Sequence, residues 1–264
     1  MENKAKQKHR KNGSKVLYYA ALIIIAIIVL VICSLTVLFH INNIYVTGDE
    51  VPYTQDEIVF ASGIETDTNI IMENTSDVSQ RVASALPYIE SVEPIKHFPF
   101  EIELKVTASE IIGQAEGAGI LIIDRTGRCI DRTDVLTKNV AVIRGTGVLN
   151  AEVGKTVSFG NDSALSNVVK MHDAFKKAGI TDITVYNISD ENKLCATYQN
   201  RIVINFGTSD NLDEKLEYAV QIIEQQKSGK QTGVLNLSRI PNDKQYAYFS
   251  PETLDETQVA SVLE

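Results

Sequence analysis

The sequence predicts an α+β protein with one N-terminal transmembrane helix followed by two folded domains. Three observations lead to this prediction. Residues 16–39 form an uncharged apolar run. Residues 40–109 carry strand and helix signals in the order β-α-α-β-β. Residues 110–250 carry a series of strand signals and two amphipathic helices, which indicates a β-rich domain with helices packed on a mostly antiparallel sheet. Residues 251–264 have the composition of a polar tail.

The apolar run is long enough to cross a bilayer as a helix. Its 24 residues would extend about 36 Å at about 1.5 Å per residue, which exceeds the hydrocarbon thickness of about 30 Å. Residues 1–15 carry six Lys or Arg and one acidic residue, and Tyr18 and Tyr19 stand near this basic end. Basic residues on one side predict a single pass through the cell membrane, with a cytoplasmic N-terminus and residues 40–264 outside.

Two other interpretations of this segment fit less well. A cleaved signal peptide has an apolar stretch of about 7–15 residues and a small-x-small cleavage site, and neither feature is present here. An acylated lipoprotein cysteine at Cys33 would want a small residue before it, but Ile32 stands there and the apolar run continues. Cys33 is therefore expected to be a small apolar residue in a membrane helix.

The charge distribution argues against nucleic-acid binding. The first 15 residues carry a net charge of +5, so the net charge of −9 for the whole chain leaves −14 for the remainder. Binding to phosphates needs clustered Lys and Arg, which an acidic exterior does not supply. The basic tail itself is explained by membrane topology and by contact with anionic lipid.

No motif for catalysis, metal binding or cofactor binding is present. The four His and three Cys do not form a zinc-binding pattern, and no nucleophile elbow or phosphate-binding loop occurs in the sequence. We therefore expect a protein without enzymatic activity, bound metal or cofactor. His172 is expected to be a histidine at the edge of a core. Cys129 and Cys195 are favoured as separate, partly buried thiols, but their spacing leaves a disulfide open.

Residues 40–109 predict a small domain in detail. Alternating apolar residues at 44–46 indicate a short strand, and Thr54 with Glu57 forms a capping box at the start of a helix. Gly63 matches the left-handed residue that ends such a helix. A second helix is predicted from Thr75 or Ser76 up to Pro87.

Two strands follow and meet at the corner His97-Phe98-Pro99. In the second strand Ile102, Leu104 and Val106 share one face, while charged residues occupy the other, which is typical of a half-buried strand. Pro99 is expected to rigidify the turn. Phe98 and Phe100 are expected to cover the end of the small core, and any partner contact of Lys96 and His97 stays open.

This arrangement resembles a POTRA domain, specifically that of the bacterial division proteins FtsQ and DivIB. The resemblance rests on "INNIYVTGDEVPYTQDEIVFASGI", on "VASALPYIESVEPIKHFPFEIELKV" and on the single-span layout. The family's Glu-Arg-x-Pro segment is replaced by "SEIIGQAEGAG", which keeps Glu110 and lacks the Arg and Pro. The matching positions are Ile41, Ile44, Val46, Gly48, Ile58, Gly63, Pro87, Tyr88, Phe98 and Pro99.

The second domain is also similar to that family. "DRTGR" indicates a hairpin turn, "SALSNVVKMHDAFKKAGI" and "SDNLDEKLEYAVQIIEQQ" indicate helices, and "GVLNLSRI" and "QYAYFS" are expected to close the sheet. Asn236 stands where the family usually has Asp, a change that keeps the shape of the side chain. These features predict the same domain organisation as in the family.

The resemblance implies a non-enzymatic divisome scaffold at the division septum that helps to control septal wall synthesis. It implies two bitopic coiled-coil partners, FtsB/DivIC-like and FtsL-like, docked on the late strands of the second domain. The expected mode is strand addition to a sheet edge, with aromatic anchors. An equally weighted interpretation is that the same late-strand residues complete the core. The candidate partner-binding residues are Leu235, Leu237, Lys244, Tyr246, Tyr248 and Phe249, with the two tyrosines on one face and Phe249 on the other.

Two other function classes fit less well. A POTRA-containing protein of secretion or outer-membrane assembly normally carries a β-barrel and several POTRA copies, and neither is visible in the sequence. An exported enzyme would need a nucleophile or metal constellation, which the motifs do not provide.

Overall fold

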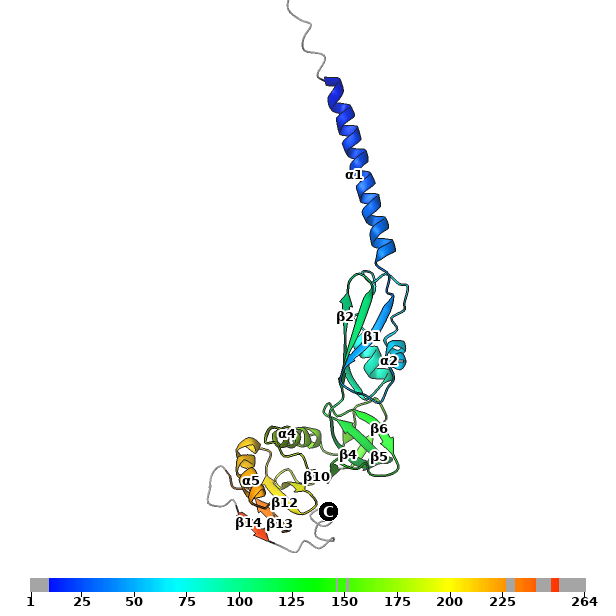
Figure 1. The fold of residues 1–264 in the computed structure, drawn as a ribbon. Helices are drawn as coiled ribbons and strands as arrows, with labels where there is room; N and C mark the ends of the chain where they lie inside the picture. The colour runs from blue at the N-terminus through cyan, green and yellow to red at the C-terminus, as the bar shows by residue number, and fades with distance from the viewer. Residues whose placement is uncertain (1–9, 146, 151, 227–230, 241–247, 252–264) are drawn as a thin grey trace, which may run out of the picture. The chain divides into compact units, whose positions relative to one another are not determined.

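The structure is a computed structural model, and it describes residues 10–145, 147–150, 152–226, 231–240 and 248–251 (Figure 1). The chain divides into two compact units. The first contains the chain up to Val82 together with Ser91–Thr107, and the second contains Ala83–Glu90 and the chain from Ala108 onward.

The first unit begins with helix α1, Arg10–Leu38. Within it, Lys15–Leu35 is apolar enough to cross a membrane: these 21 residues contain an 18-residue window with a mean hydropathy of 3.1 that is not buried against the rest of the protein. An exposed helix of this composition needs an apolar surrounding. The helix therefore fits a single-pass membrane protein, as the sequence predicted.

The folded part of the first unit, taken together with Ala83–Glu90, which ends α3 and begins β2, has the predicted order β-α-α-β-β. The elements are β1 Asn43–Gly48, α2 Gln55–Ser62, α3 Val78–Ala85, β2 Ile89–His97 and β3 Glu101–Ala108. Strand β3 lies between the other two strands, and β1 pairs with it in parallel. The first strand of the domain therefore pairs with the last one.

Local sequence signals explain the ends of these elements. Glu57 N donates to Thr54 Oγ1 over 3.3 Å and Thr54 N donates to Glu57 Oε2 over 2.7 Å, which confirms the capping box. Gly63 adopts φ = 66° at the end of α2. Helix α3 starts later than predicted, because Ser76 N donates to Asn74 Oδ1 over 3.0 Å and forms a turn before the helix.

The core of this unit is built on β3. Ile102 and Leu104 are fully buried and Val106 is almost so, which confirms the predicted inner face. Gly48 lies opposite Val106 with φ = +104°, and a Cβ there would clash with the Val106 carbonyl oxygen. Only glycine fits this close approach without strain.

The corner between β2 and β3 differs from the prediction. Phe98 is 59% exposed and Phe100 is 42% exposed, so neither covers the core. Ile41 and Ile70, both fully buried, occupy the core instead. Phe98 packs edge-on against Phe39, with ring centroids 6.2 Å apart. The rings thus lie outside the core, on the surface.

The second unit is built on one nine-stranded sheet with the order β14-β13-β12-β11-β10-β7-β4-β5-β6. Antiparallel pairs outnumber parallel ones, which confirms a mostly antiparallel sheet. A two-stranded sheet of β8 and β9 accompanies it. The strands are β4 Ile111–Gly117, β5 Gly119–Asp124, β6 Cys129–Thr133, β7 Val142–Arg144, β8 Val148–Asn150, β9 Ser158–Phe159, β10 Ile183–Asn187, β11 Leu194–Tyr198, β12 Ile202–Gly207, β13 Gly233–Asn236 and β14 Tyr248–Pro251.

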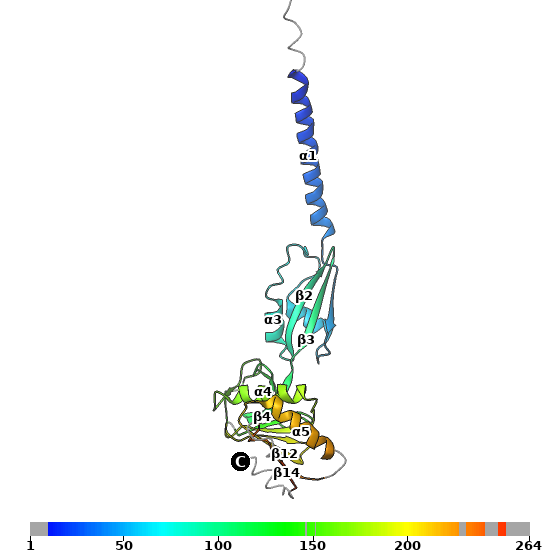
Figure 2. The same cartoon turned by 90° about the vertical axis from the view of Figure 1, so that its left-hand side faces the viewer.

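Two helices, α4 Ala164–Lys177 and α5 Leu212–Gln226, cover one face of this sheet (Figure 2). The buried rings of Phe175 on α4 and Phe206 on β12 meet edge-on, with centroids 5.6 Å apart. Lys215 on α5 is 2% exposed, and its ammonium donates to the Phe206 and Thr208 carbonyl oxygens over 2.8 and 3.0 Å. These bonds satisfy the buried lysine and fix α5 to the end of β12.

Candidate partner-binding edge of the large sheet

Strand β14 is the last described strand at one end of the nine-stranded sheet. It pairs antiparallel with β13, with Phe249 opposite Leu235 and Tyr248 opposite Asn236. Strand β13 in turn pairs in parallel with β12. Among the described strands, β14 is paired on one side only, which is the geometry that strand addition would use.

The predicted partner-binding residues divide by burial. Leu235 and Leu237 are fully buried, so their side chains belong to the core and only their backbone lies near the edge strand. Phe249 is half-buried and packs against the same core, whereas Tyr248 is 53% exposed. Tyr248 and Phe249 therefore lie on opposite faces. Lys244 and Tyr246 lie outside the described residues.

Gly233 allows β14 to lie close to β13. A Cβ at this position would meet the Phe249 ring at 2.7 Å and would clash with the Ser250 carbonyl oxygen. The absence of a side chain at Gly233 is therefore what admits the Phe249 ring over the end of β13. This contact positions Phe249 and, one residue earlier, the exposed Tyr248.

Asn236 ends β13 by a local turn. Its Oδ1 accepts from Ser238 N over 3.0 Å and from Ser238 Oγ over 2.8 Å. An aspartate oxygen would accept both bonds equally well. The asparagine side chain can therefore form the same turn as the aspartate that the family usually has here, as expected for a side chain of the same shape.

The opposite end of the sheet carries a polar network that sequence reasoning missed. Asp124, 1% exposed, accepts through Oδ1 from Thr126 N, Thr126 Oγ1 and Arg128 N over 2.6–2.9 Å, and Arg128 Nε lies 3.2 Å from its other oxygen. The visible signal was the Asp-x-x-Gly-Arg turn in "DRTGR". An acid at the start of such a turn commonly caps it.

Arg128 then connects this turn to residues far away in the sequence but within the same unit. Its guanidinium donates to the carbonyl oxygens of Ala83, Pro87 and Ile89 over 2.9–3.1 Å and to Ser109 Oγ over 3.0 Å. Since the side chain is only 14% exposed, these partners replace most of its hydration. Arg128 is therefore the central donor at this end of the sheet.

A second polar group lines a cavity of about 390 Å³ beside α4. Glu110 Oε1 accepts from Lys176 Nζ over 2.6 Å and lies 3.1 Å from His172 Nε2. The bond from Lys176 is the main reason that the pKa of Glu110 falls below its usual range. Tyr186 OH lies 3.4 Å from His172 Nδ1, and burial raises the pKa of Tyr186 above its usual value. These groups satisfy one another, which fits a histidine at the edge of a core.

Cys129 and Cys195 are separate thiols. Cys129 is buried and Cys195 half-buried, and neither forms a disulfide. Burial raises the pKa of Cys129 and raises that of Cys195 to about 11, so both stay protonated near neutral pH and are poor nucleophiles. In the described part of the chain, no group of three or more His, Cys, Asp or Glu is placed to hold a metal ion.

Comparison with known proteins agrees with this architecture. Residues 39–107 match the family model of the POTRA domain, FtsQ-type. The cell division protein DivIB of Clostridium botulinum is 24% identical over 227 residues, covering 84% of this chain and 88% of the relative. DivIB of Clostridium acetobutylicum is 23% identical over 215 residues, covering 80% and 84%.

A third relative carries the other family name. The cell division protein FtsQ of Streptomyces griseus is 20% identical over 173 residues, which is 65% of this chain and 81% of the relative. The alignments extend well beyond the POTRA domain, so they include much of the large sheet. At modest sequence identity, the domain match and these relatives support the FtsQ/DivIB family of cell division proteins for this chain.

Proposed function

We propose that this protein is a non-enzymatic scaffold of the bacterial division machinery that binds other membrane-anchored division proteins outside the cytoplasm. The observation that carries the proposal is the terminal strand β14, with one half-buried and one exposed aromatic residue on its two faces. The names of the relatives support a role in division. The polar groups described above are engaged in structural contacts, which is in keeping with a binding protein.

The proposed topology follows from the charges around α1. The basic residues 1–15 lie in the cytoplasm, α1 crosses the cell membrane once, and the two units lie outside at the division septum. The partners are FtsB/DivIC-like and FtsL-like bitopic proteins, and through them the scaffold helps to control septal wall synthesis. Each partner is itself a single-span protein, so all contacts form within reach of one membrane surface.

The proposed mode of binding is addition of a partner strand to the outer edge of β14. Backbone hydrogen bonds would supply affinity, and side chains on alternate positions would supply selectivity. Tyr248 offers an exposed aromatic anchor, and Tyr246 and Lys244 lie on the segment just before it. Leu235 and Leu237 act from beneath, because their buried side chains hold β13 against the helices.

A binding measurement on the full-length chain tests this edge. The chain is reconstituted in nanodiscs, and its affinity for the extracytoplasmic segments of an FtsB/DivIC-like and an FtsL-like protein is measured. The double variant Tyr246→Ala/Tyr248→Ala should weaken binding by about 2 kcal/mol or more, as expected for aromatic anchors.

Phe60→Ala is the matched control, because Phe60 is 89% exposed and lies on α2 in the first unit. It should leave the affinity unchanged. Equal affinity for the double variant and the wild type would remove β14 from the binding site. Absence of a fluorescently labelled chain from the septum of dividing cells would contradict the division role itself.

A further inference from the structure

Exposed apolar side chains gather at one end of the first unit. Among its described residues beyond α1, five large apolar side chains are exposed, and four of them come from two neighbouring loops. Ile71 and Met72 are 47% and 85% exposed in the loop before α3, and Phe98 and Phe100 are 59% and 42% exposed at the corner of β2 and β3. We call these four residues the loop patch. Exposed apolar groups that cluster in this way mark an interaction surface.

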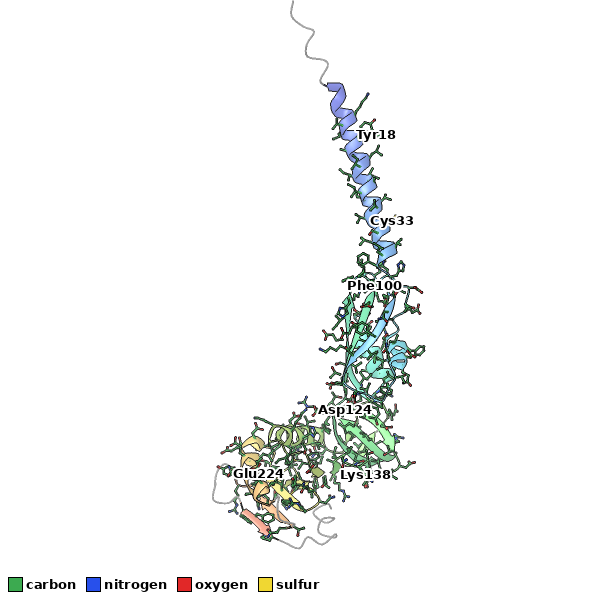
Figure 3. The ribbon with its side chains drawn as sticks, viewed as in Figure 1. Tyr18, Cys33, Phe100, Asp124, Lys138 and Glu224 are labelled. Carbon is green, nitrogen blue, oxygen red and sulfur yellow. The ribbon has the colours of Figure 1, made fainter. Side chains whose placement is uncertain are left out.

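Backbone hydrogen bonds tie both loops to the segment that leaves α1. Ile70 N donates to the Phe39 carbonyl oxygen over 2.9 Å, and Asn42 N donates to the Phe100 carbonyl oxygen over 2.9 Å. His40 forms a β-bridge with Asn69, next to Ile70. Phe39 also contacts Phe98 through its ring. The loop patch therefore surrounds the exit of α1, where Figure 3 labels Phe100.

The short connection limits how far the loop patch can lie from a membrane. Helix α1 ends at Leu38, and β1 begins at Asn43. The intervening residues can span no more than roughly 15 Å even when fully extended. The interfacial layer of a bilayer occupies several ångströms on each side of the hydrocarbon core. Whatever the tilt of α1, loops bonded to this connection stay close to that layer.

We propose that the loop patch inserts into the interfacial layer of the outer leaflet and holds the POTRA domain against the lipid surface. The proposal rests on the membrane anchoring by α1 proposed above. Phenylalanine, isoleucine and methionine lose exposed apolar area when they enter the headgroup–acyl boundary, at about 25 cal/mol per Å². The favoured occupant is lipid, because the patch is continuous with the end of the apolar helix itself.

Neighbouring contacts keep the two loops in place for this role. Lys96 Nζ donates to the Glu73 carbonyl oxygen over 2.6 Å and so fastens the first loop to β2. His97 Nε2 lies 2.7 Å from Glu103 Oε2, and its ring stacks on Tyr45. Lys96 and His97 are thus engaged in contacts within the domain, while the four apolar side chains of the loop patch stay exposed.

The absence of tryptophan in the chain allows a direct test. Single variants Phe98→Trp and Met72→Trp, one in each loop, are reconstituted as full-length protein in liposomes that contain brominated phospholipid and no other protein. Phe60→Trp is the exposed control on α2, and Ile27→Trp reports on α1. For each variant, the quenching of tryptophan fluorescence by the brominated lipid and the wavelength of maximum emission are measured.

The two patch variants should be quenched at least about twofold more than Phe60→Trp and should emit at shorter wavelength, because an interfacial ring lies about 5–10 Å into the boundary region. If the patch variants are quenched no more than Phe60→Trp while Ile27→Trp is strongly quenched, the proposed insertion of the loop patch is wrong. Membrane anchoring by α1 is then still supported. Lack of quenching at Ile27→Trp would overturn both. A patch that is reserved for a protein partner gives the first of these negative results, since the liposomes contain no partner.

Discussion

The two ends of the large sheet are built in opposite ways. At the β6 end, the buried Asp124 and Arg128 bind backbone groups from several segments of the same unit. At the β14 end, the strand pairs with β13 and Phe249 packs over Gly233. One end is fastened by buried side-chain hydrogen bonds, and the other by backbone strand pairing and the packing of one ring.

This difference separates stability from recognition. Replacing a buried, fully hydrogen-bonded arginine leaves several buried acceptors without a donor. Such an arginine therefore favours one arrangement of the chain. A terminal strand held by pairing on one side keeps its opposite edge for another chain. We therefore expect substitutions at the β6 end to affect folding, and substitutions at the β14 end to affect partner binding more than folding.

The largest expected effect is that of Arg128→Ala. It removes the guanidinium from Asp124 Oδ2 and from the carbonyl oxygens of Ala83 and Ile89 in a buried site. Loss of one partner of a buried pair costs about 3–5 kcal/mol. The free energy of unfolding, measured by urea denaturation, should fall by this amount.

Arg125→Ala is the matched control in the same turn. Arg125 pairs with Asp173 over 2.7 Å, but both side chains are more than 40% exposed. An exposed pair contributes about 0–1 kcal/mol. If both arginine variants lose the same stability, the buried network has no special role at the β6 end.

Gly233→Ala should act on the β14 end with a smaller effect. The new methyl group would push against the Phe249 ring and the Ser250 carbonyl oxygen, and overpacking of this kind costs about 1–3 kcal/mol. Because the strain falls on the edge strand, amide exchange of β14 should rise more than that of β5, and partner affinity should fall.

Gly147→Ala provides the comparison, since a Cβ at Gly147 meets nothing within 4 Å. Its stability should stay within about 0.5 kcal/mol of the wild type. Uniform acceleration of exchange across the sheet in Gly233→Ala would show that the β14 end is not a separable element.

Tyr88→Phe sharpens the β6 side of the comparison. Tyr88 OH donates to Asp131 Oδ2 over 2.8 Å, which joins β6 to the start of β2 within the second unit. Removing one partly buried hydrogen bond should lower the free energy of unfolding by about 1 kcal/mol. Tyr248→Phe, at an exposed position on β14, should leave it unchanged, and the reverse order of the two effects would contradict the contrast drawn here.

The smallest predicted effect is a pH dependence at Glu110, away from both ends. Its pKa is lowered in the folded state, mainly by the bond from Lys176. The resulting stabilisation is fully present above the ordinary Glu pKa of about 4.3 and is lost as the pH falls through the lower folded value. With partly exposed groups it amounts to less than about 1 kcal/mol.

Unfolding curves of wild type and Lys176→Met, recorded from neutral to acidic pH, test this linkage. The wild type should be slightly more stable at neutral pH, and the difference should shrink at acidic pH. A difference that is independent of pH would assign the effect of Lys176 to packing of its methylene groups instead.

The elements that sequence reasoning predicted correctly are those specified locally. The capping box at Thr54 and Glu57 depends on residues three positions apart, and the inner face of β3 depends on strict alternation. The uncharged run that became α1 is likewise a property of consecutive residues. Such signals survive folding because neighbours in sequence stay neighbours in space.

The features that escaped prediction depend on distant partners. Arg128 donates to the carbonyl oxygen of Ala83, which lies 45 positions earlier in the sequence. The residues around Arg128 carry no pattern that predicts this acceptor. Phe98 is 59% exposed whereas Ile41 and Ile70 are fully buried, and the local pattern around these three apolar residues does not distinguish them. For the candidate site, Leu235 and Leu237 match the apolar pattern of an interface and of a core equally well, and only their burial assigns the side chains to the core.

The parallel pairing of β1 with β3 also bears on the order in which the chain is made and exported. Ile44 follows directly after α1, yet its strand partner is Ile102, at the far end of the domain. In the topology proposed above, β1 would leave the membrane first and stay unpaired while the two helices and β2 follow. The POTRA sheet can close only when β3 has been translocated, so a long-range contact sets the pace of folding. Until then, a factor that shields an unpaired strand at the exit of the translocation channel would act on this segment.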